Sequence, residues 1–414
     1  MGAYLDRVDA APDAEKWPLV RKLMTQERQP FFAELRAERP VMKLPDGIYF
    51  ATRHADCTLV LQRWNDFGVD LYKPKQGDYF MAQDDTADHW RDKSIMKSIL
   101  DFEDLPAIRT FVGEETARIL REAGGTIDAP PQLTRMVPCR LVQDFFGFTG
   151  SDAAKLIEWS YWNQTDAFHN QFFDGDVIDD PELVVRERKK AGFRLALYLG
   201  RVLLTRWVQL KLHRDKQDSV TRLLRLSGSK GVKFGLSKVL FNAGGLLIGT
   251  IETTSVTVCN ALAELLARPD MLERARAAAA ASDPAGFDGY VVEALRFNPA
   301  FPYFFRTCHT PTQLAGGTGH AVTVEPGATI LACTHSAMFD PEAYADPDNF
   351  DARRTMYQTF TLGYGHHECL GRAIATVMIP EIVRQVLLLP GLRADGPVEW
   401  KYGVPEHYPL RWDA

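Results

Sequence analysis

The sequence predicts a mainly α-helical fold with a small β region, and three features of the 414-residue chain support this prediction. From 88 to 226 the apolar residues mostly recur at spacings of three and four, the period of an amphipathic helix. A long, weakly charged segment at 236–268 predicts a further helix. After Arg296, prolines and paired glycines separate short apolar runs, a pattern typical of short strands and turns.

The individual elements follow in chain order. Alternating residues at 41–52 surround a Pro-Asp-Gly turn and predict a β-hairpin, with a helix after it at about 55–63. Breaks in the helical half are expected at 124–125, 130–131 and 174–181. The later expectations are an Ala-rich helix, a helix ending near Arg296, strands at 321–324 and 329–332, an irregular stretch at 339–364, and a helix to about Leu389. Because no repeat or flexible linker divides the chain, we expect one domain over residues 1–414.

Composition excludes several classes of protein. Hydrophobic residues make up 46% and charged residues 25%, as in a globular chain with a sizeable core. The formal net charge of -6 gives no global basic field, so we expect no nucleic-acid and no membrane partner, and any charged docking surface must be local. The acidic first 16 residues do not form a secretory signal, which indicates a cytoplasmic protein. The apolar segment 195–210 is interrupted by Arg201 and Arg206 and predicts an amphipathic helix.

One cysteine has a distinctive setting. The six cysteines are scattered without a C-x-x-C pair, which fits a reducing compartment. Cys369 lies among three glycines just before an apolar helix, where the helix dipole and free amides favour a thiolate. Such a sulfur suits a metal, and glycines allow close approach to a flat ligand. Two alternatives remain open here: a buried core thiol, and a zinc site shared with His366 and His367, which is the weakest because no second Cys/His cluster is near.

This loop resembles the heme-binding signature of the cytochrome P450 family, F-G-x-G-x-H-x-C-x-G. The matching residues are Gly363, Gly365, His367, Cys369 and Gly371, whereas Leu362 replaces the leading Phe. The resemblance implies that Cys369 is the axial ligand of the iron in heme b. It also implies the P450 fold, with the heme between the long central helix and the helix that follows the cysteine loop.

The segment 249–254 of the long helix resembles the family pattern A-G-x-[DE]-T-[TS]. A glycine, an acid and β-branched residues are poor choices for a purely structural helix, and threonine hydroxyls that bond to preceding carbonyls bend helices. The resemblance implies that Glu252 and Thr253 form the acid–alcohol pair that delivers protons. Thr250 replaces the usual second glycine. The alternative is a kinked core helix with a solvated Glu252.

Glu293 and Arg296 are three residues apart on one helix and stand where the family has E-x-x-R. By resemblance Arg354, in a segment with Ala352 in place of the usual proline, completes a buried structural network with them. That network would hold the cysteine loop against the core.

Four side chains resemble the family's partners of the heme propionates. His89 and Lys93 stand where the family has H-x-x-x-R, and Arg306 and His367 follow later in the chain. Propionates are anions, so cationic or hydrogen-bond-donating side chains are the chemistry that the site needs. For each of them taken alone, a solvated surface position is an equally good explanation.

Family resemblance also places the substrate pocket. Its expected lining residues are Phe80, Met81, Phe172, Gly245, Ile248, Gly249, Phe301 and Tyr408. A lining this apolar and aromatic favours a hydrophobic small molecule, although any single member could simply belong to the core.

The resulting hypothesis is a monooxygenase that inserts one oxygen atom of O2 into such a substrate by hydroxylation, epoxidation or dealkylation. No Rossmann fingerprint or cysteine cluster supplies a flavin or iron–sulfur domain, so electrons are expected from a separate ferredoxin and NAD(P)H-dependent reductase. The expected docking surface contains Arg91, Lys97, Arg354 and Arg372. The alternatives are a peroxide- or hydroperoxide-using heme-thiolate enzyme and a heme sensor or carrier.

Overall fold

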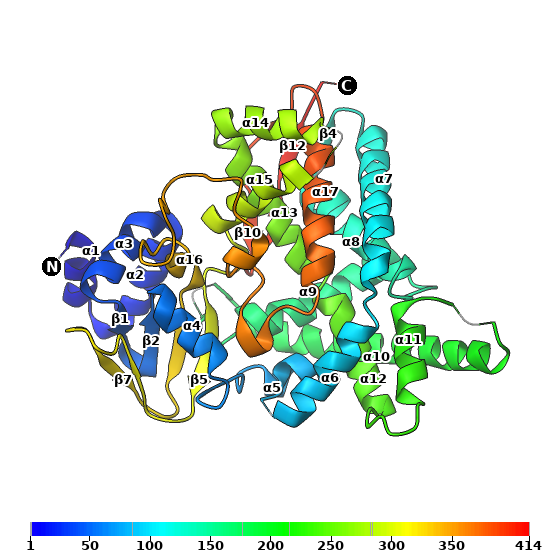
Figure 1. Cartoon of the computed structure of the whole chain (residues 1–414), viewed down its shortest axis with the longest axis horizontal. Coiled ribbons are helices and arrows are strands. Elements are labelled where there is room, and N and C mark those ends of the chain that lie inside the picture. The colour runs from blue at the N-terminus through cyan, green and yellow to red at the C-terminus, as the bar shows by residue number, and fades with distance from the viewer. Residues whose placement is uncertain are drawn as a thin grey trace. The chain divides into compact units, whose positions relative to one another are not determined.

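The computed structural model describes residues 2–84, 86–175, 177–214, 216–281, 283 and 285–413. The chain divides into two compact units, each made of an early and a late segment. Unit 1 comprises Met1–Leu71 and Arg296–Cys369, and unit 2 comprises Tyr72–Leu295 and Leu370–Ala414. Figure 1 shows both units, with elements labelled where there is room.

Unit 1 contains a five-stranded sheet in the order β1–β2–β8–β5–β3. Its strands are β1 (Val41–Lys43), β2 (Ile48–Ala51), β3 (Phe67–Gly68), β5 (Phe304–Cys308) and β8 (Thr329–Ala332). β2 and β8 pair in parallel and are buried at every residue, as expected for central parallel strands. A separate hairpin joins β6 (Thr312–Leu314) to β7 (Val322–Val324). The predicted hairpin and both predicted strands are confirmed.

The described part of unit 1 also contains five α-helices. They are α1 (Ala3–Ala10), α2 (Asp13–Gln26), α3 (Arg28–Glu38), α4 (His54–Gln62) and α16 (Thr334–Ala337). Apolar residues of α4 and α16 join those of β8 and β5 in one buried cluster. The predicted irregular stretch at 339–364 is also confirmed, because a short 3-10 turn at Met356–Gln358 is its only regular element among the described residues.

Unit 2 is mostly helical. Its helices are α5 (Lys73–Gln76), α6 (Thr86–Ser98), α7 (Leu105–Ala123), α8 (Met136–Asp144), α9 (Ala153–His169), α10 (Pro181–Lys211), α11 (Ser219–Ser227), α12 (Leu236–Ile248), α13 (Ile251–Leu266), α14 (Pro269–Ala279), α15 (Ala285–Phe297, whose last two residues belong to unit 1) and α17 (Arg372–Leu387). Its strands are β4 (Thr126–Asp128), β9 (Arg393–Ala394), β10 (Glu399–Lys401), β11 (Val404–His407) and β12 (Pro409–Arg411). β12 pairs with both β4 and β9, and β10 pairs with β11.

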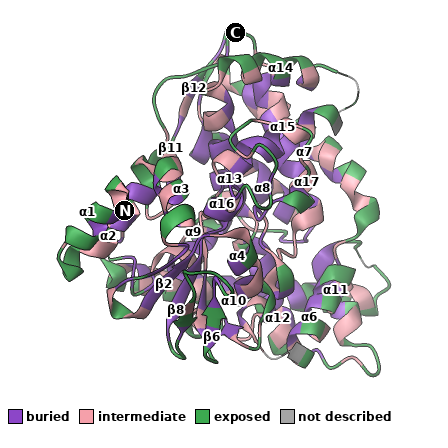
Figure 2. Ribbon diagram, turned by 60° about the vertical axis from the view of Figure 1, so that its left-hand side comes forward, coloured by how far each residue is buried: buried purple, intermediate pink, exposed green. Residues whose placement is uncertain are grey.

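The core of unit 2 lies along α13, which packs against α9, α14, α17 and β11. Figure 2 shows α13 mostly in the colour of buried residues. The stretch Leu236–Leu266 is long and apolar enough to cross a membrane, but 72% of its most apolar window is buried inside the protein. A helix that is apolar on all sides is expected in a protein core, and that is where this one lies.

The long helix predicted at 236–268 is interrupted, which corrects that expectation. α12 ends at Ile248 and α13 begins at Ile251. The Thr250 hydroxyl donates to the Leu246 carbonyl at 2.6 Å, and the Thr250 amide bonds to Leu247 instead of to the residue four positions back. Threonine hydroxyls that bond to the carbonyl four residues back bend helices, and this bond lies at the interruption.

Candidate active site

The cysteine loop of unit 1 has a tightly closed backbone. The Cys369 amide donates to the Leu362 carbonyl and the Gly363 amide to the Phe360 carbonyl, both at 2.9 Å. Gly365 has a φ of 71°, and a Cβ atom there would lie 2.5 Å from the Leu61 carbonyl oxygen. Only glycine fits this position without displacing backbone. The glycines therefore fix the course of the loop that leads to Cys369.

Cys369 differs from the other five cysteines because it alone among the six is not fully buried. Burial raises the pKa of both Cys139 and Cys259 to about 12. It also holds the pKa of Cys57 and Cys333 well above the ordinary value. These thiols fit the core interpretation, whereas Cys369 is only partly buried, which is compatible with a metal ligand.

The propionate candidates of unit 1 lie on two segments. Arg306 on β5 is 5% exposed, and its Nη1 donates to the Phe305 carbonyl at 2.8 Å. His367 follows Gly365, and its ring lies 4.9 Å from that of His366, which stacks on Trp64. The buried position of Arg306 rules out the solvated surface explanation for this side chain.

The propionate candidates of unit 2 are also buried. His89 on α6 is fully buried, with Nδ1 3.0 Å from the Phe80 carbonyl oxygen. Lys93, one turn later on the same helix, is 4% exposed. Because a buried cation needs an anionic partner or hydrogen-bond acceptors, both side chains fit the chemistry of a propionate site better than a solvated surface.

The E-x-x-R residues on α15 are both fully buried. In unit 1, Arg296 donates to the carbonyls of Met338 at 3.0 Å and Asn349 at 3.3 Å, and its guanidinium lies over the rings of Phe297 and Phe339. Arg296 therefore holds two points of the irregular stretch that leads to the cysteine loop.

The third residue of the expected network contacts the same stretch. Arg354 donates to the Ala345 carbonyl at 2.8 Å and lies over the Tyr344 ring. These contacts support a structural role for Arg354, because they fold the segment 344–354 back on itself.

Glu252 on α13 forms a buried ion pair in unit 2. Its carboxylate lies 2.9 Å from Nε of Arg135, and both side chains are almost completely excluded from solvent. Arg135 also donates to the Pro405 carbonyl at 2.9 Å and lies 3.7 Å from the Glu406 carboxylate. The alternative of a solvated Glu252 is therefore wrong. Sequence reasoning missed Arg135, which looks like any charged residue at the start of a helix.

The pKa of the Glu252 carboxyl lies close to neutral pH. The pKa of Glu252 is raised to about 7, because burial raises it more than the charge and hydrogen bonds of Arg135 lower it, and the charge of Glu406 adds to the increase. Thr253 is half-buried, while its neighbours from Ile251 to Leu262 are buried. Its hydroxyl donates to the Gly249 carbonyl at 2.6 Å. A carboxyl with this pKa can take up and release protons at physiological pH.

An open cleft of about 1100 Å³ in unit 2 is lined in part by Arg135, the partner of Glu252. α8, α9 and the β10–β11 hairpin line it, and Arg135, Tyr161 and Glu406 are among its lining residues. Water in the cleft can therefore reach the groups that surround Glu252. None of the residues predicted to line the substrate pocket borders this cleft.

The predicted pocket residues differ widely in burial. Phe80, Gly245 and Tyr408 are buried, and Met81, Ile248 and Phe301 are half-buried, whereas Gly249 is exposed. Phe172 is 60% exposed with its ring against Phe173, so the structure does not support its assignment to a pocket. It lies in a loop, where the sequence carries no signal for the direction of a side chain.

A polar residue that the sequence reasoning missed is Gln164 on α9. It is fully buried, and neither of its amide atoms has a hydrogen-bond partner among the described residues. It lies one turn after Ser160, which donates to the Leu247 carbonyl on α12 at 3.4 Å. A buried amide of this kind is suited to receive the polar group of a ligand.

Comparison with known proteins shows which family the chain is similar to. The family model described as Cytochrome P450 matches residues 287–389, which contain Glu293, Arg296, Arg306, Arg354 and Cys369. The monooxygenase PikC of Streptomyces venezuelae is 26% identical over 92% of this chain and 90% of its own length. The vitamin D(3) 25-hydroxylase of Pseudonocardia autotrophica is 26% identical over 84% of this chain and 83% of its own length.

Residues 287–389 therefore match the cytochrome P450 family, and relatives of that family are similar to this chain over most of its length. The crystal structure of CalO2 shares the fold, with a TM-score of 0.78 and 20% identity over 94% of this chain and 97% of that one. The open form of EryK from S. erythraea has a TM-score of 0.77 and 22% identity, over 93% and 95%. The predicted P450 fold, the heme b cofactor and the monooxygenase class are thereby confirmed, and the zinc interpretation of the cysteine loop is not supported.

The residues of the cysteine loop fit heme. A flat macrocycle requires close backbone approach, which the glycines permit, and Cys369 is only partly buried where the other five cysteines are buried.

We predict that Gly365→Ala destabilises the holoenzyme and lowers its heme content. A residue that has a Cβ atom loses about 1 kcal/mol of stability in the left-handed backbone conformation, and contact between this Cβ and the Leu61 carbonyl adds to that cost. The matched control is Gly47→Ala in the same unit, which has a φ of 72° but no atom within 4 Å of its Cβ. Thermal unfolding and the ratio of heme to protein measure the effect. Equal losses in the two variants would contradict the closed loop described above.

Proposed function

We propose that this P450 inserts one oxygen atom of O2 into a hydrophobic small-molecule substrate, by hydroxylation, epoxidation or dealkylation, with electrons from a separate ferredoxin and NAD(P)H-dependent reductase. The observation that carries the proposal is the buried Glu252–Arg135 pair beside Thr253. Enzymes that use O2 and electrons must also take up protons, whereas enzymes that use peroxide directly can dispense with this supply. The peroxide-using alternative is therefore less well supported.

Heme b, held through the sulfur of Cys369, would supply the iron chemistry that activates O2. His89, Lys93, Arg306 and His367 would bind its propionates by charge and hydrogen bonding. Glu293, Arg296 and Arg354 would act through structure, by holding the segment before the cysteine loop.

Protons would enter from the cleft and reach Glu252 next to Arg135. Arg135 acts as a positioning residue, because its guanidinium orients the Glu252 carboxylate and lowers its proton affinity. Thr253, whose hydroxyl is anchored to the Gly249 carbonyl, would pass the proton on from Glu252. This acid–alcohol pair is the catalytic assignment made from the sequence.

The substrate would be mainly hydrophobic. Apolar residues of α12 and of the segment before α6, including Gly245, Ile248 and Phe80, would provide most of the contacts. Gln164 would supply one hydrogen bond and so select substrates with a polar group at the matching place. The relatives named vitamin D(3) 25-hydroxylase and erythromycin C-12 hydroxylase support hydroxylation as the reaction.

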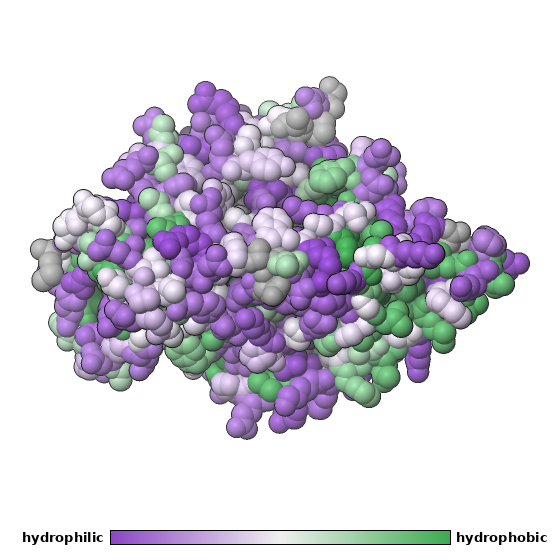
Figure 3. All heavy atoms as spheres, turned by 60° about the horizontal axis from the view of Figure 1, so that its bottom comes forward, coloured by the Kyte–Doolittle hydropathy of each residue, from purple (hydrophilic) through white to green (hydrophobic). Residues whose placement is uncertain are grey.

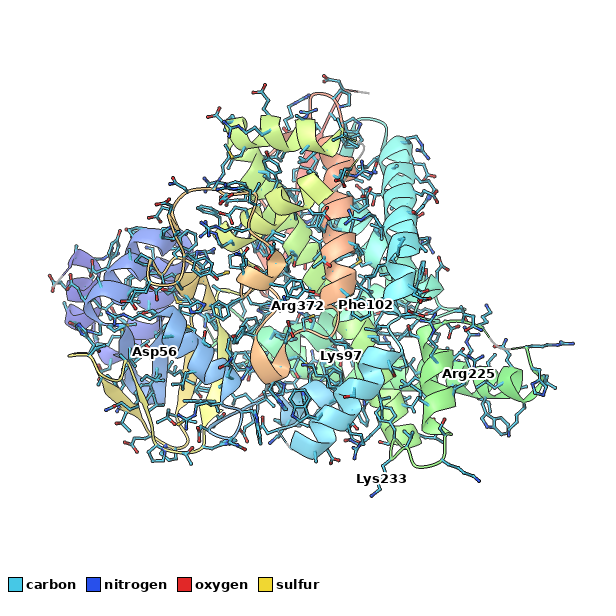
Figure 4. The ribbon with its side chains drawn as sticks, viewed as in Figure 1. Asp56, Lys97, Phe102, Arg225, Lys233 and Arg372 are labelled. Atoms are coloured by element: carbon cyan, nitrogen blue, oxygen red, sulfur yellow. The ribbon has the colours of Figure 1, made fainter. Side chains whose placement is uncertain are left out.

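Of the four cations expected to dock the ferredoxin, Arg91 and Arg354 are engaged in contacts within the protein. Arg91 is ion-paired with Asp88 at 2.5 Å and Asp92 at 2.7 Å, and Arg354 bonds to Ala345. Lys97 on α6 is exposed, and Arg372 lies in the first turn of α17 (Figure 4). Lys97 is the better candidate for contact with an acidic partner, because it is exposed. A cytoplasmic location belongs to the same proposal.

The function is tested with the purified holoenzyme, a ferredoxin, its reductase, NAD(P)H and ¹⁸O2. The substrate is taken from a screen of hydrophobic compounds for a shift of the heme spin state. We expect one labelled oxygen atom in the product and no turnover without the reductase. Efficient turnover with hydrogen peroxide alone, without electrons or O2, would contradict the proposal in favour of the peroxide-using alternative.

The pH dependence of turnover tests the proton supply. Glu252 donates in its protonated form, so the rate should fall as pH rises through about 7. We call this fall the alkaline limb of the pH profile. Glu406→Gln removes a charge that raises the pKa of Glu252 and should move this limb to lower pH. Arg135→Gln removes the charge that lowers it and should move the limb to higher pH. Glu252→Gln should abolish the limb and slow turnover by roughly 10² or more.

The control for this series is Glu399→Gln, which removes another carboxylate from the cleft without a role in the pKa of Glu252. It should leave the pH profile unchanged. Movement of the limb in the same direction in Glu406→Gln and Arg135→Gln would show that Glu252 is not the group that titrates.

A further inference from the structure

α10 has an exposed apolar face. Five large hydrophobic side chains on this helix, which are between 42% and 65% exposed, are Phe193, Leu197, Leu204, Trp207 and Val208. Exposed Gly200 lies between them. Figure 3 shows hydrophobic residues gathered on the right of its face, the side on which α10 and α11 lie in Figure 1. Soluble proteins rarely expose apolar side chains in such a cluster without a function.

The positions of these residues place them on one side of the helix. Successive separations of four, three, four, three and one residues, counted through Gly200, follow the helical repeat, so the face extends for about 22 Å along the axis. The core-facing side of α10 has its own apolar set, namely Val184, Ala191, Leu195, Leu199, Val202 and Leu203. That set packs toward α9, α11 and α12. The exposed face is therefore additional to the one that folding requires.

This face lies in the most basic part of the chain. Residues 188–249 contain 14 Lys and Arg but only two Asp and no Glu, in a chain whose formal net charge is -6. Lys189, Arg201 and Lys211 are exposed on α10, at the two ends and along one border of the face. Arg206 is different, because it is buried and pairs with Asp218 at 2.8 Å. The apolar residues are thus bordered by cations.

The basic surface continues beyond α10. Arg225 is exposed on α11 and Lys233 is exposed in the loop before α12. Figure 4 shows the side chain of Lys233 pointing away from the ribbon. The charge therefore extends over neighbouring elements of unit 2 and favours an extended anionic partner.

We propose that α10 docks this P450 on the surface of an anionic lipid bilayer, with the helix lying in the plane of the interface. Helices that lie in this way combine an apolar face containing Trp, Phe and Leu with bordering Lys and Arg. The apolar side chains enter the boundary between headgroups and acyl chains, and the cations bind lipid phosphates. The expectation of no membrane partner rested on the net charge of the whole chain, which does not report this local asymmetry.

A second copy of the chain fits the surface less well. Pairing through α10 in a symmetric dimer would place two sets of cations against each other, and like charges across an interface oppose association. A bilayer with anionic headgroups instead offers the complementary charge over an area as long as the helix.

The test is flotation of the holoenzyme with vesicles of phosphatidylcholine alone and with vesicles that also contain phosphatidylglycerol. We expect binding to the anionic vesicles at low salt, weak binding to the neutral ones, and release as salt is raised, because salt screens the charges. No substrate or reductase is present, so the result does not depend on the monooxygenase proposal. Equal binding to both vesicles, or none to either, would overturn the docking surface.

Two double variants separate the apolar and the charged contributions. Leu197→Ser with Leu204→Ser, and Lys189→Gln with Arg201→Gln, should each weaken binding to anionic vesicles by roughly tenfold or more. All four side chains are exposed, so the heme spectrum and thermal unfolding should stay as in the unmodified protein. Unchanged binding in either double variant would overturn the proposal.

The matched controls lie outside α10. Phe102→Ser removes an aromatic side chain that is 69% exposed, and Lys22→Gln with Lys43→Gln removes two exposed cations of unit 1. Neither should alter vesicle binding. A dimer in analytical ultracentrifugation that the Leu197 and Leu204 double variant dissociates would assign the face to a second copy and overturn the membrane assignment.

Discussion

The closed backbone of the cysteine loop is the constraint on which the rest of the site depends. Two contacts constrain the backbone of this loop. The Cys369 amide donates to the Leu362 carbonyl, and Gly365 packs closely on the Leu61 carbonyl. Arg296 fastens the preceding segment at Met338 and Asn349. A ligand to iron must be held with sub-ångström tolerance, and a loop fixed at both ends by backbone contacts can achieve this.

The second constraint on the fold is the electrostatic cost of burying the Glu252 carboxylate. Burial of a carboxylate costs several kcal/mol, and Arg135 does not fully offset this cost for Glu252, because the pKa of Glu252 remains raised to about 7. The buried pair Arg206–Asp218 in the same unit is a useful contrast. Asp218 also accepts a hydrogen bond from the Thr221 amide at the start of α11, which gives it a structural role. Among the described hydrogen bonds, Glu252 accepts only from Arg135, and its position in the helix core is better explained by proton transfer.

The sequence predicted those parts of the fold that have a local pattern. The hairpin at 41–52, the strands at 321–324 and 329–332 and the setting of Cys369 each depend on neighbouring residues, and the structure confirms them. The sheet of β4, β12 and β9 was missed, because strands of two or three residues carry no periodicity and Thr126 pairs with the distant Arg411. The threonine pattern predicted a bend in the long helix but not its division at Gly249 and Thr250.

The site was predicted where the family motifs name a residue, and it was missed where tertiary contacts decide. The motif predicts Glu252, but its ion-pair partner Arg135 comes from another segment of the chain and has no motif of its own. Gln164 became notable only through its burial without a hydrogen-bond partner in the described part of the chain. The exposed face of α10 is a related case, because an amphipathic pattern does not show which apolar residues the fold leaves uncovered.

The most direct test of the central claim, thiolate ligation of heme iron by Cys369, is a visible spectrum. The purified protein and its Cys369→Ala variant are reduced with dithionite under carbon monoxide, with Cys139→Ala as a control from the buried thiols. We predict a strongly red-shifted Soret band in the unmodified protein and the control, and its loss in Cys369→Ala. A red-shifted band that survives in Cys369→Ala, or purified protein that binds no heme, would contradict the assignment and the mechanism built on it.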